Sequence, residues 1–143
     1  MNTINDQAKF RGGVSTESNR PIRFAGSALG AMRHICAFFH SPDEEYQVLL
    51  PFIKDGFARG EKAFDFELRN WADAYLRDGH FDQNRMLALI QEVLEGGRQQ
   101  GFPLTRLVAH MEWALEDRPG VDDLVEYETR LNYLLPGYKD PVI

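Results

Sequence analysis

The sequence has 143 residues, of which 43% are hydrophobic and 12% aromatic, and this is enough to form one domain with a sizeable core. Its net charge of −6 and pI near 5.2, without any basic cluster, argue against direct nucleic-acid binding, which needs a basic surface to displace counterions. A single cysteine excludes an internal disulfide, and the lack of a signal peptide or a long apolar run predicts a cytoplasmic protein without membrane contact.

The chain begins with polar residues 1–20, which show no hydrophobic periodicity and are expected to form a mobile tail. Residues 34–39 then form a continuous apolar run of strand length. Such a run is typical of a strand covered on both faces, as in the parallel sheets of α/β proteins. We therefore expect a buried, central strand at this point of the chain.

A helix is predicted directly after this strand. Ser41 is a good N-cap, Pro42 suits the first helical position, and Glu44 completes a capping box. Gly60 is the expected stop, and Pro51 should remove one backbone hydrogen bond and kink the helix. The predicted inner face consists of the apolar residues that recur at helical spacing: Tyr46, Leu49, Leu50, Ile53 and Phe57.

The only cysteine lies between two histidines on the predicted strand. His34 and His40 would be roughly 20 Å apart on one extended strand, so they cannot share a metal ion. His34 and Cys36 share a face about 7 Å apart, and an ion there would need further ligands, so we expect no metal and no cofactor. We interpret Cys36 as an inert core thiol. His40, with Phe39 before it, ends the strand at the edge where open α/β sheets bind ligands.

A second unit of helix and strand follows. Asp82 is the candidate N-cap of a helix that closes at Gly96 and Gly97, and a strand is predicted over residues 107–111. The helix carries an apolar stripe made of Met86, Leu87, Ile90, Val93 and Leu94. This alternation of helix and strand predicts a parallel sheet, in which the new strand also points its carboxyl end at the ligand-binding edge.

Three side chains of functional interest stand at the end of that strand: His110, Glu112 and Trp113. An imidazole, a carboxylate and an indole at this edge could orient a small polar ligand against an aromatic wall. The alternative is that His110 forms an internal hydrogen bond and that Trp113 belongs to the core. The residues alone leave both interpretations open.

The last predicted helix runs from about residue 121 to residue 135, with Asp122 or Asp123 as its N-cap. Glu128 falls on the inner face, where a carboxylate needs a partner or its pKa rises. Residues 141–143 look like the start of a further strand. The tyrosines in or just after the helix either form an interface or cover the sheet: Tyr127, Tyr133 and Tyr138.

Three long stretches carry a family resemblance: RHICAFFHSPDEEYQVLLPFIKDGFARGEKAF, WADAYLRDGHFDQNRMLALI and GFPLTRLVAHMEWALEDRPGVDDLVEYETRLNYLLP. They resemble the MEDS domain, a sensory domain of methanogen, methylotroph and dichloromethane-responsive regulators that is usually joined to kinase or DNA-binding modules. The resemblance implies a Rossmann-like or degenerate RecA-like three-layer α/β fold with a mostly parallel sheet. It also implies binding of small hydrocarbon derivatives, with His34 and Glu112 in the positions of the family's histidine and acidic residue.

The chain departs from this family at one place. A single residue separates Phe64 from Phe66, where the family has about thirty, and two parallel strands cannot be joined by one residue. Either residues 62–69 form one alternating strand, or a segment is absent near residues 64–66. The C-terminal strand is likewise cut short, and we otherwise expect residues 21–143 to form a single sensory domain.

These observations predict a non-catalytic, stand-alone sensory domain that binds a small molecule in signal transduction or transcriptional regulation and reports through a protein partner or as a homo-oligomer. The predicted ligand-binding residues are His34, Phe39, His40, His110, Glu112 and Trp113. One alternative is a protein-interaction scaffold without a ligand. Another is a hydrolase or transferase that uses Cys36, which is disfavoured because a mid-strand thiol lacks the exposed, polar surroundings of a nucleophile.

Overall fold

The computed structural model describes residues 20–65 and 76–143. The predicted tail therefore lies outside the described residues, except for Arg20. The second half of the alternating stretch at residues 62–69 lies outside them as well, while its first half forms a strand.

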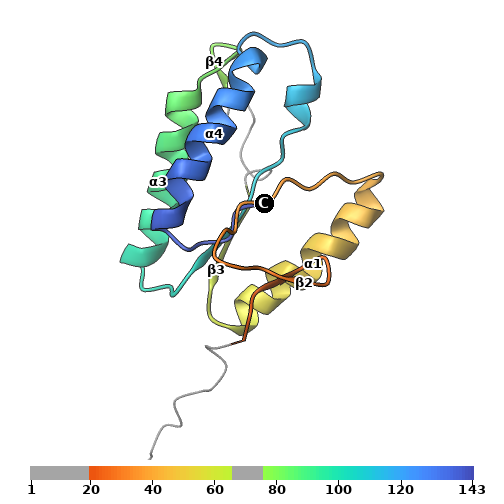
Figure 1. Ribbon diagram of the computed structural model, residues 1–143, viewed down its shortest axis with the longest axis vertical. Helices are drawn as coiled ribbons and strands as arrows, with labels where there is room; N and C mark the ends of the chain where they lie inside the picture. The colour runs from red at the N-terminus through yellow and green to blue at the C-terminus, as the bar shows by residue number, and fades with distance from the viewer. Residues whose placement is uncertain (1–19, 66–75) are drawn as a thin grey trace, which may run out of the picture.

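The described residues form a mixed α/β structure around one parallel strand pair. Strand β3 (Lys62–Asp65) pairs with β6 (Thr105–Val108) in parallel. Helix α1 (Pro42–Ala58) lies on one side of this pair, and helices α3 (Gln83–Gln99) and α4 (Leu124–Leu134) lie next to each other on the other side (Figure 1). The α/β class and the parallel pairing that the sequence predicts are thus confirmed.

The parallel pairing continues from β6 to the last residues of the chain. Val142 forms parallel bridges with Leu107 on one side and with His34 on the other. The Leu107 N–H donates to the carbonyl of Pro141, and the Val142 N–H donates to the carbonyl of Arg33. The residues around Val142 therefore lie between β6 and the segment at His34, in agreement with the strand predicted to begin there.

The remaining strands are short antiparallel pairs, β1 (Arg23–Phe24) with β2 (Ser27–Ala28) and β4 (Leu76–Arg77) with β5 (His80–Phe81). Within the described ranges, the 3₁₀ helices are η3 (Glu112–Leu115), η4 (Val121–Asp123) and η5 (Leu135–Gly137). The Rossmann-like or RecA-like three-layer fold implied by the resemblance stays a prediction. None of the helices in the described ranges has both the length and the apolar character needed to cross a membrane.

The predicted central strand at residues 34–39 is wrong beyond its first residue. Among the described residues, only His34 forms a bridge there, and the segment that follows belongs to no strand. Its side chains alternate between partly buried and exposed, with Cys36 and Phe38 on the exposed side and Phe38 90% accessible. A run of apolar residues shows that a segment could be buried on both faces. Such burial needs a packed element against each face, and here the face that carries Cys36 and Phe38 is exposed to solvent. Cys36 is consequently an exposed thiol and not a core residue.

Helix α1 begins as its sequence predicts. The Ser41 hydroxyl accepts a hydrogen bond from the Glu44 N–H at 3.2 Å, while the Glu44 carboxylate accepts one from the His40 N–H at 2.7 Å. The helix continues through Pro51 and ends before Gly60, whose φ of 70° is the left-handed conformation expected of a glycine stop.

The inner face of α1 differs from the predicted one. The buried residues are Leu49, Phe52 and Gly56, whereas Tyr46 and Phe57 are 64% and 63% exposed. Apolar residues occupy almost every side of this helix, so periodicity alone does not select the buried face.

Helix α3 follows its prediction more closely. The Asp82 carboxylate accepts a hydrogen bond from the Arg85 N–H at 3.0 Å, and the whole predicted apolar stripe is buried. The helix does not close at Gly96 and Gly97 but continues to Gln99. Gly97 is instead a contact position, because a Cβ there would lie 2.1 Å from the hydroxyl oxygen of Thr105.

Helix α4 is preceded by the 3₁₀ turn η4, and Asp123 occupies its N-cap position as predicted, but the Asp123 side chain makes no capping hydrogen bond. Of the three tyrosines, Tyr127 is buried and Tyr133 is 85% exposed.

Two hydrophobic cores lie on opposite faces of β6. Leu107 faces the core built by α3 and α4, which includes Trp113. Val108, the next residue, faces a second core that includes Leu49 and Phe52 of α1. Alternate side chains of a strand point to opposite faces, so β6 contributes to both cores through the neighbouring residues Leu107 and Val108.

Candidate functional site

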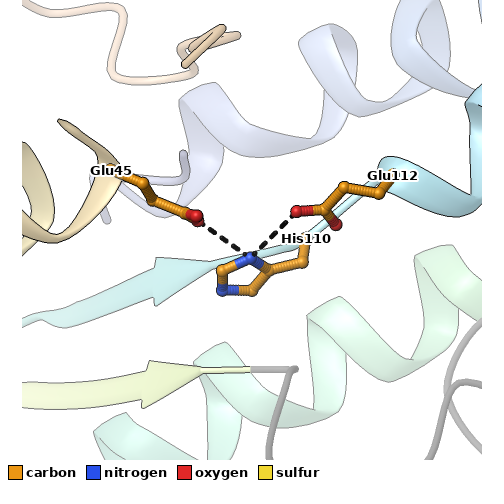
Figure 2. A group of neighbouring side chains, drawn as sticks. All are labelled: Glu45, His110 and Glu112. Carbon is orange, nitrogen blue, oxygen red and sulfur yellow. Dashed lines mark ion pairs between the residues drawn. The ribbon is translucent and has the colours of Figure 1, made fainter. Parts of the chain in front are cut away.

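Glu45, His110 and Glu112 converge at the carboxyl end of β6. The His110 Nδ1 atom lies 3.1 Å from the Glu45 Oε1 atom and 3.7 Å from the Glu112 Oε1 atom. Figure 2 shows the imidazole between the two carboxylates, both directed at the same ring nitrogen. The His110 side chain is 9% exposed, and the Glu45 and Glu112 side chains are 24% and 57% exposed. The group is thus anchored in the protein on one side and open to solvent on the other.

Local structure explains this convergence. Glu45 stands in the first turn of α1, a helix fixed by its Ser41 cap. β6 ends at Val108, two residues before His110, and η3 then begins at Glu112, which turns that carboxylate back towards the imidazole. Glu45 thus comes from α1, His110 from the loop after β6 and Glu112 from η3, so their convergence depends on the tertiary fold.

The sequence prediction contained two of these three side chains. His110 and Glu112 are brought together as expected, but Glu45 was missed because an acidic residue in a first helical turn is already explained by the helix dipole. The only signal available was positional, since α1 starts at the same edge of the sheet as β6 ends.

The other predicted residues at this edge lie differently. Trp113 is 0% exposed and packs against Phe81, with ring centroids 4.8 Å apart, and so forms part of the core as the alternative interpretation held. Phe39 is partly buried against the second core, and His40 is exposed.

His34 takes part in a second polar group, formed with α4. Its Nδ1 atom lies 2.9 Å from the Asn132 Oδ1 atom, and its Nε2 atom lies 3.3 Å from the Glu128 Oε2 atom. An amide oxygen can only accept a hydrogen bond, so Nδ1 is the donor to Asn132, and Nε2 faces the Glu128 carboxylate. Burial raises the pKa of Glu128, and the nearby His34 lowers it only in part. The sequence predicted that Glu128 has a partner or a raised pKa; His34 lies beside its carboxylate, and the pKa is raised nevertheless.

Cys36 is exposed, but its surroundings do not favour a thiolate. Partial burial raises the pKa of the Cys36 thiol, and the negative charge of Glu128 raises it further. A catalytic cysteine needs the opposite shift, which a neighbouring cation or a helix N-terminus provides.

A buried charge network that sequence reasoning missed surrounds Arg106 of β6. Its side chain is 0% exposed and pairs with Glu61 at 2.5 Å and with Asp55 at 2.7 Å, and it also donates to the carbonyl of Phe52. All these partners lie in α1 or just after it, so the network attaches α1 to the sheet.

A surface pocket of about 450 Å³ lies at the start of α3, and its lining residues include none of the predicted ligand-binding residues. Its polar side chains already have structural roles, since Asp82 caps α3 and the His80 Nδ1 atom lies 2.7 Å from the carbonyl oxygen of Phe81. The lining residues are Asp78, His80, Phe81, Asp82, Gln83, Asn84 and Asp123.

Comparison with known proteins gives two matches. A family model described as "MEthanogen/methylotroph, DcmR Sensory domain" (MEDS) matches residues 63–141. A curated relative, "Transcriptional repressor DcmR" of Methylorubrum extorquens, is 24% identical over an alignment of 150 positions that covers 90% of this chain and 56% of the relative. The chain thus spans about half the length of that relative. No solved structure matches the chain.

Proposed function

The chain belongs to the MEDS family, as the sequence resemblance indicated, and we propose on this basis that it is a ligand-binding sensory domain of a regulatory system. The family description and the relative named as a transcriptional repressor support a sensory role in regulation. The proposed ligand is a small molecule, such as a simple hydrocarbon derivative that carries a polar group.

The observation that carries the proposal is the convergence of Glu45, His110 and Glu112 at the end of β6. Carboxylates and an imidazole at this edge can fix the polar end of a ligand, because a few converging polar groups are how binding sites orient small molecules. Glu112 is the most exposed of the three and is the group that a ligand would meet first. We place the binding site here, with Phe39 and His40 on the segment that leads into α1.

A sensory domain must convert ligand binding into a change that another molecule reads. The response is limited by the difference in ligand affinity between two states of the protein. α4 is the proposed output surface, because it contacts His34 through Glu128 and Asn132 and exposes Tyr133 to solvent. Sedimentation with and without ligand, together with capture of partners from the host, tests this output; a monomer in both conditions that captures no partner would contradict it.

The ligand is best sought by a thermal-shift screen of small alcohols, amines, carboxylic acids and halogenated hydrocarbons. A ligand at a hundred times its Kd should stabilise the folded state by about 2.7 kcal/mol, which corresponds to a rise in Tm of roughly 5–10 °C. Glu112→Gln should then weaken binding of the identified ligand while changing stability little. Asp43→Asn, which neutralises an exposed carboxylate in the same first turn as Glu45, serves as the control. Unchanged affinity in Glu112→Gln would move the site, most directly to His34.

The two alternative functions make different predictions. A scaffold without a ligand gives no thermal shift with any compound but still captures a partner. An enzyme that uses Cys36 requires an activated thiol, and the raised pKa of this thiol argues against one. Slow alkylation of the native thiol at neutral pH would favour the sensory domain.

A further inference from the structure

The group at the end of β6 has the dimensions of a metal site. Its ligand atoms, one from each of Glu45, His110 and Glu112, all lie within 4.8 Å of one another. A tetrahedral zinc ion with bonds of about 2.0–2.2 Å to nitrogen and oxygen holds its ligand atoms roughly 3.3–3.6 Å apart. The distances of 3.1 Å and 3.7 Å from the His110 Nδ1 atom to the two carboxylates lie on either side of that range.

Hydrogen bonding alone does not account for both carboxylates. The Nδ1 atom of an imidazole carries at most one hydrogen, so it can donate to one carboxylate only. Glu45 is at hydrogen-bonding distance from it, whereas Glu112 at 3.7 Å is beyond that distance yet is directed at the same atom (Figure 2). A cation between the three ligand atoms would contact both carboxylates at once.

The charge of the group also favours a cation. Within residues 20–65 and 76–143, neither Glu45 nor Glu112 forms an ion pair with a lysine or arginine. Two carboxylates therefore face one imidazole, and a proton on that ring would balance only one of their charges. A divalent ion would balance both and leave the imidazole neutral, which is the form that binds metals.

We propose that Glu45, His110 and Glu112 bind a divalent transition-metal ion of the zinc class. One imidazole and two carboxylates are suitable ligands for zinc, iron(II) and manganese(II). Calcium and magnesium are less suitable, because they prefer oxygen ligands only. Three protein ligands leave the fourth position of a tetrahedral ion open, and the exposure of Glu112 leaves that position accessible from solvent. The proposal stands on this geometry and does not depend on which small molecule, if any, the sensory domain binds.

The test is a calorimetric titration of the full chain with Zn²⁺ alone, after removal of metals by a chelator. We expect saturable binding of one ion per chain. Glu45→Gln and Glu112→Gln keep the shape of each side chain but weaken a metal ligand, and each should raise the Kd for Zn²⁺ at least tenfold. Asp43→Asn is the matched control, because it removes the same charge from the same first turn as Glu45 and should leave the Kd unchanged.

Cobalt(II) provides a second readout, since a tetrahedral Co²⁺ complex has visible absorption bands that free Co²⁺ lacks. These bands should appear with the unmodified chain and with Asp43→Asn, and should be lost in both glutamine variants. Circular dichroism verifies that each variant is folded. Absence of saturable Zn²⁺ binding to the unmodified chain, equal affinity in folded glutamine variants, or equal weakening in Asp43→Asn would each overturn the proposal. Small-molecule binding is not part of this test, so a failure here leaves the proposed sensory function to its own screen.

Discussion

Arg106 shows how one buried residue links an element to the sheet. Its guanidinium is held by Glu61 and Asp55, and it also stacks over the Phe52 ring with its central carbon 4.6 Å from the ring centroid. Burial raises the pKa of Asp55, but hydrogen bonds from Arg106 and Arg59 outweigh it, so the net pKa lies below its ordinary value. The unfolded chain therefore binds more protons than the folded one between the two pKa values, and stability increases with pH across that window.

Asp55→Asn should consequently destabilise the protein most at neutral pH. The charged hydrogen bond to Arg106 is worth about 1–2 kcal/mol when allowance is made for the partial exposure of Asp55. The contribution is present above the ordinary pKa of an aspartate and is lost as the pH falls through the lowered value of the folded state. Urea denaturation at pH 7, 5, 4 and 3 should show a gap to the unmodified chain that stays nearly constant from pH 7 to pH 5 and narrows below pH 4, because the contribution is lost only below the ordinary aspartate pKa of 3.8. A gap that is constant over this range would contradict the role assigned to the Asp55 charge.

Cys36 is exposed and not buried as the sequence predicted, and its exposure has consequences for stability and reactivity. Because the side chain is exposed, Cys36→Ser should change the free energy of unfolding by less than about 0.5 kcal/mol. Native alkylation should go to completion but more slowly than that of a free thiol at pH 7, since the raised pKa lowers the fraction of thiolate. A large loss of stability in Cys36→Ser, measured by chemical denaturation, would show that the thiol is buried after all.

The helices show how far local sequence determines an element. The caps at Ser41 and Asp82 were predictable because each involves atoms three residues apart. The buried stripe of α3 was predictable because its other faces are polar, whereas α1 is apolar on most sides and its buried face was predicted only in part. The missing strand at residues 35–39 and the position of Glu45 depend on which distant segments pack beside them, and local sequence does not indicate those segments.

Two adjacent glycines in α3 provide a matched test of this difference between local propensity and packing. A Cβ at Gly96 has nothing within 4 Å, so Gly96→Ala should stabilise the protein by about 0.5–1 kcal/mol through helix propensity alone. A Cβ at Gly97 would lie 2.1 Å from the Thr105 hydroxyl on a buried, β-branched side chain, so Gly97→Ala should destabilise by roughly 1–3 kcal/mol. Thermal denaturation of both variants measures the contrast, and effects of equal sign would refute the close approach of α3 to β6.

At the scale of the whole molecule, stability depends on residues at the far end of the chain. Val142 is 2% exposed and lies between Leu107 and His34 in the parallel arrangement. Val142→Ala should therefore cost about 2–3 kcal/mol from lost burial and the cavity left behind. Val125→Ala makes the same chemical change on an exposed face of α4, where the residue is 76% accessible, and should stay within about 0.5 kcal/mol of the unmodified chain. Equal costs for the two variants in urea denaturation would mean that Val142 does not occupy the middle of the sheet.

The place of Val142 also affects when the molecule can fold during its synthesis. The ribosome makes His34 and β6 first, and the segment that separates them in the sheet emerges only afterwards, about 100 residues behind His34. Until then, the backbone groups of Leu107 that later bond Pro141 and Ile143 have only solvent as a partner on that side. Contacts this distant in sequence are slow to form, and an unpaired strand edge invites pairing with other chains. The edge of β6 at Leu107 thus stays open to misassembly until residues 141–143 have left the ribosomal tunnel.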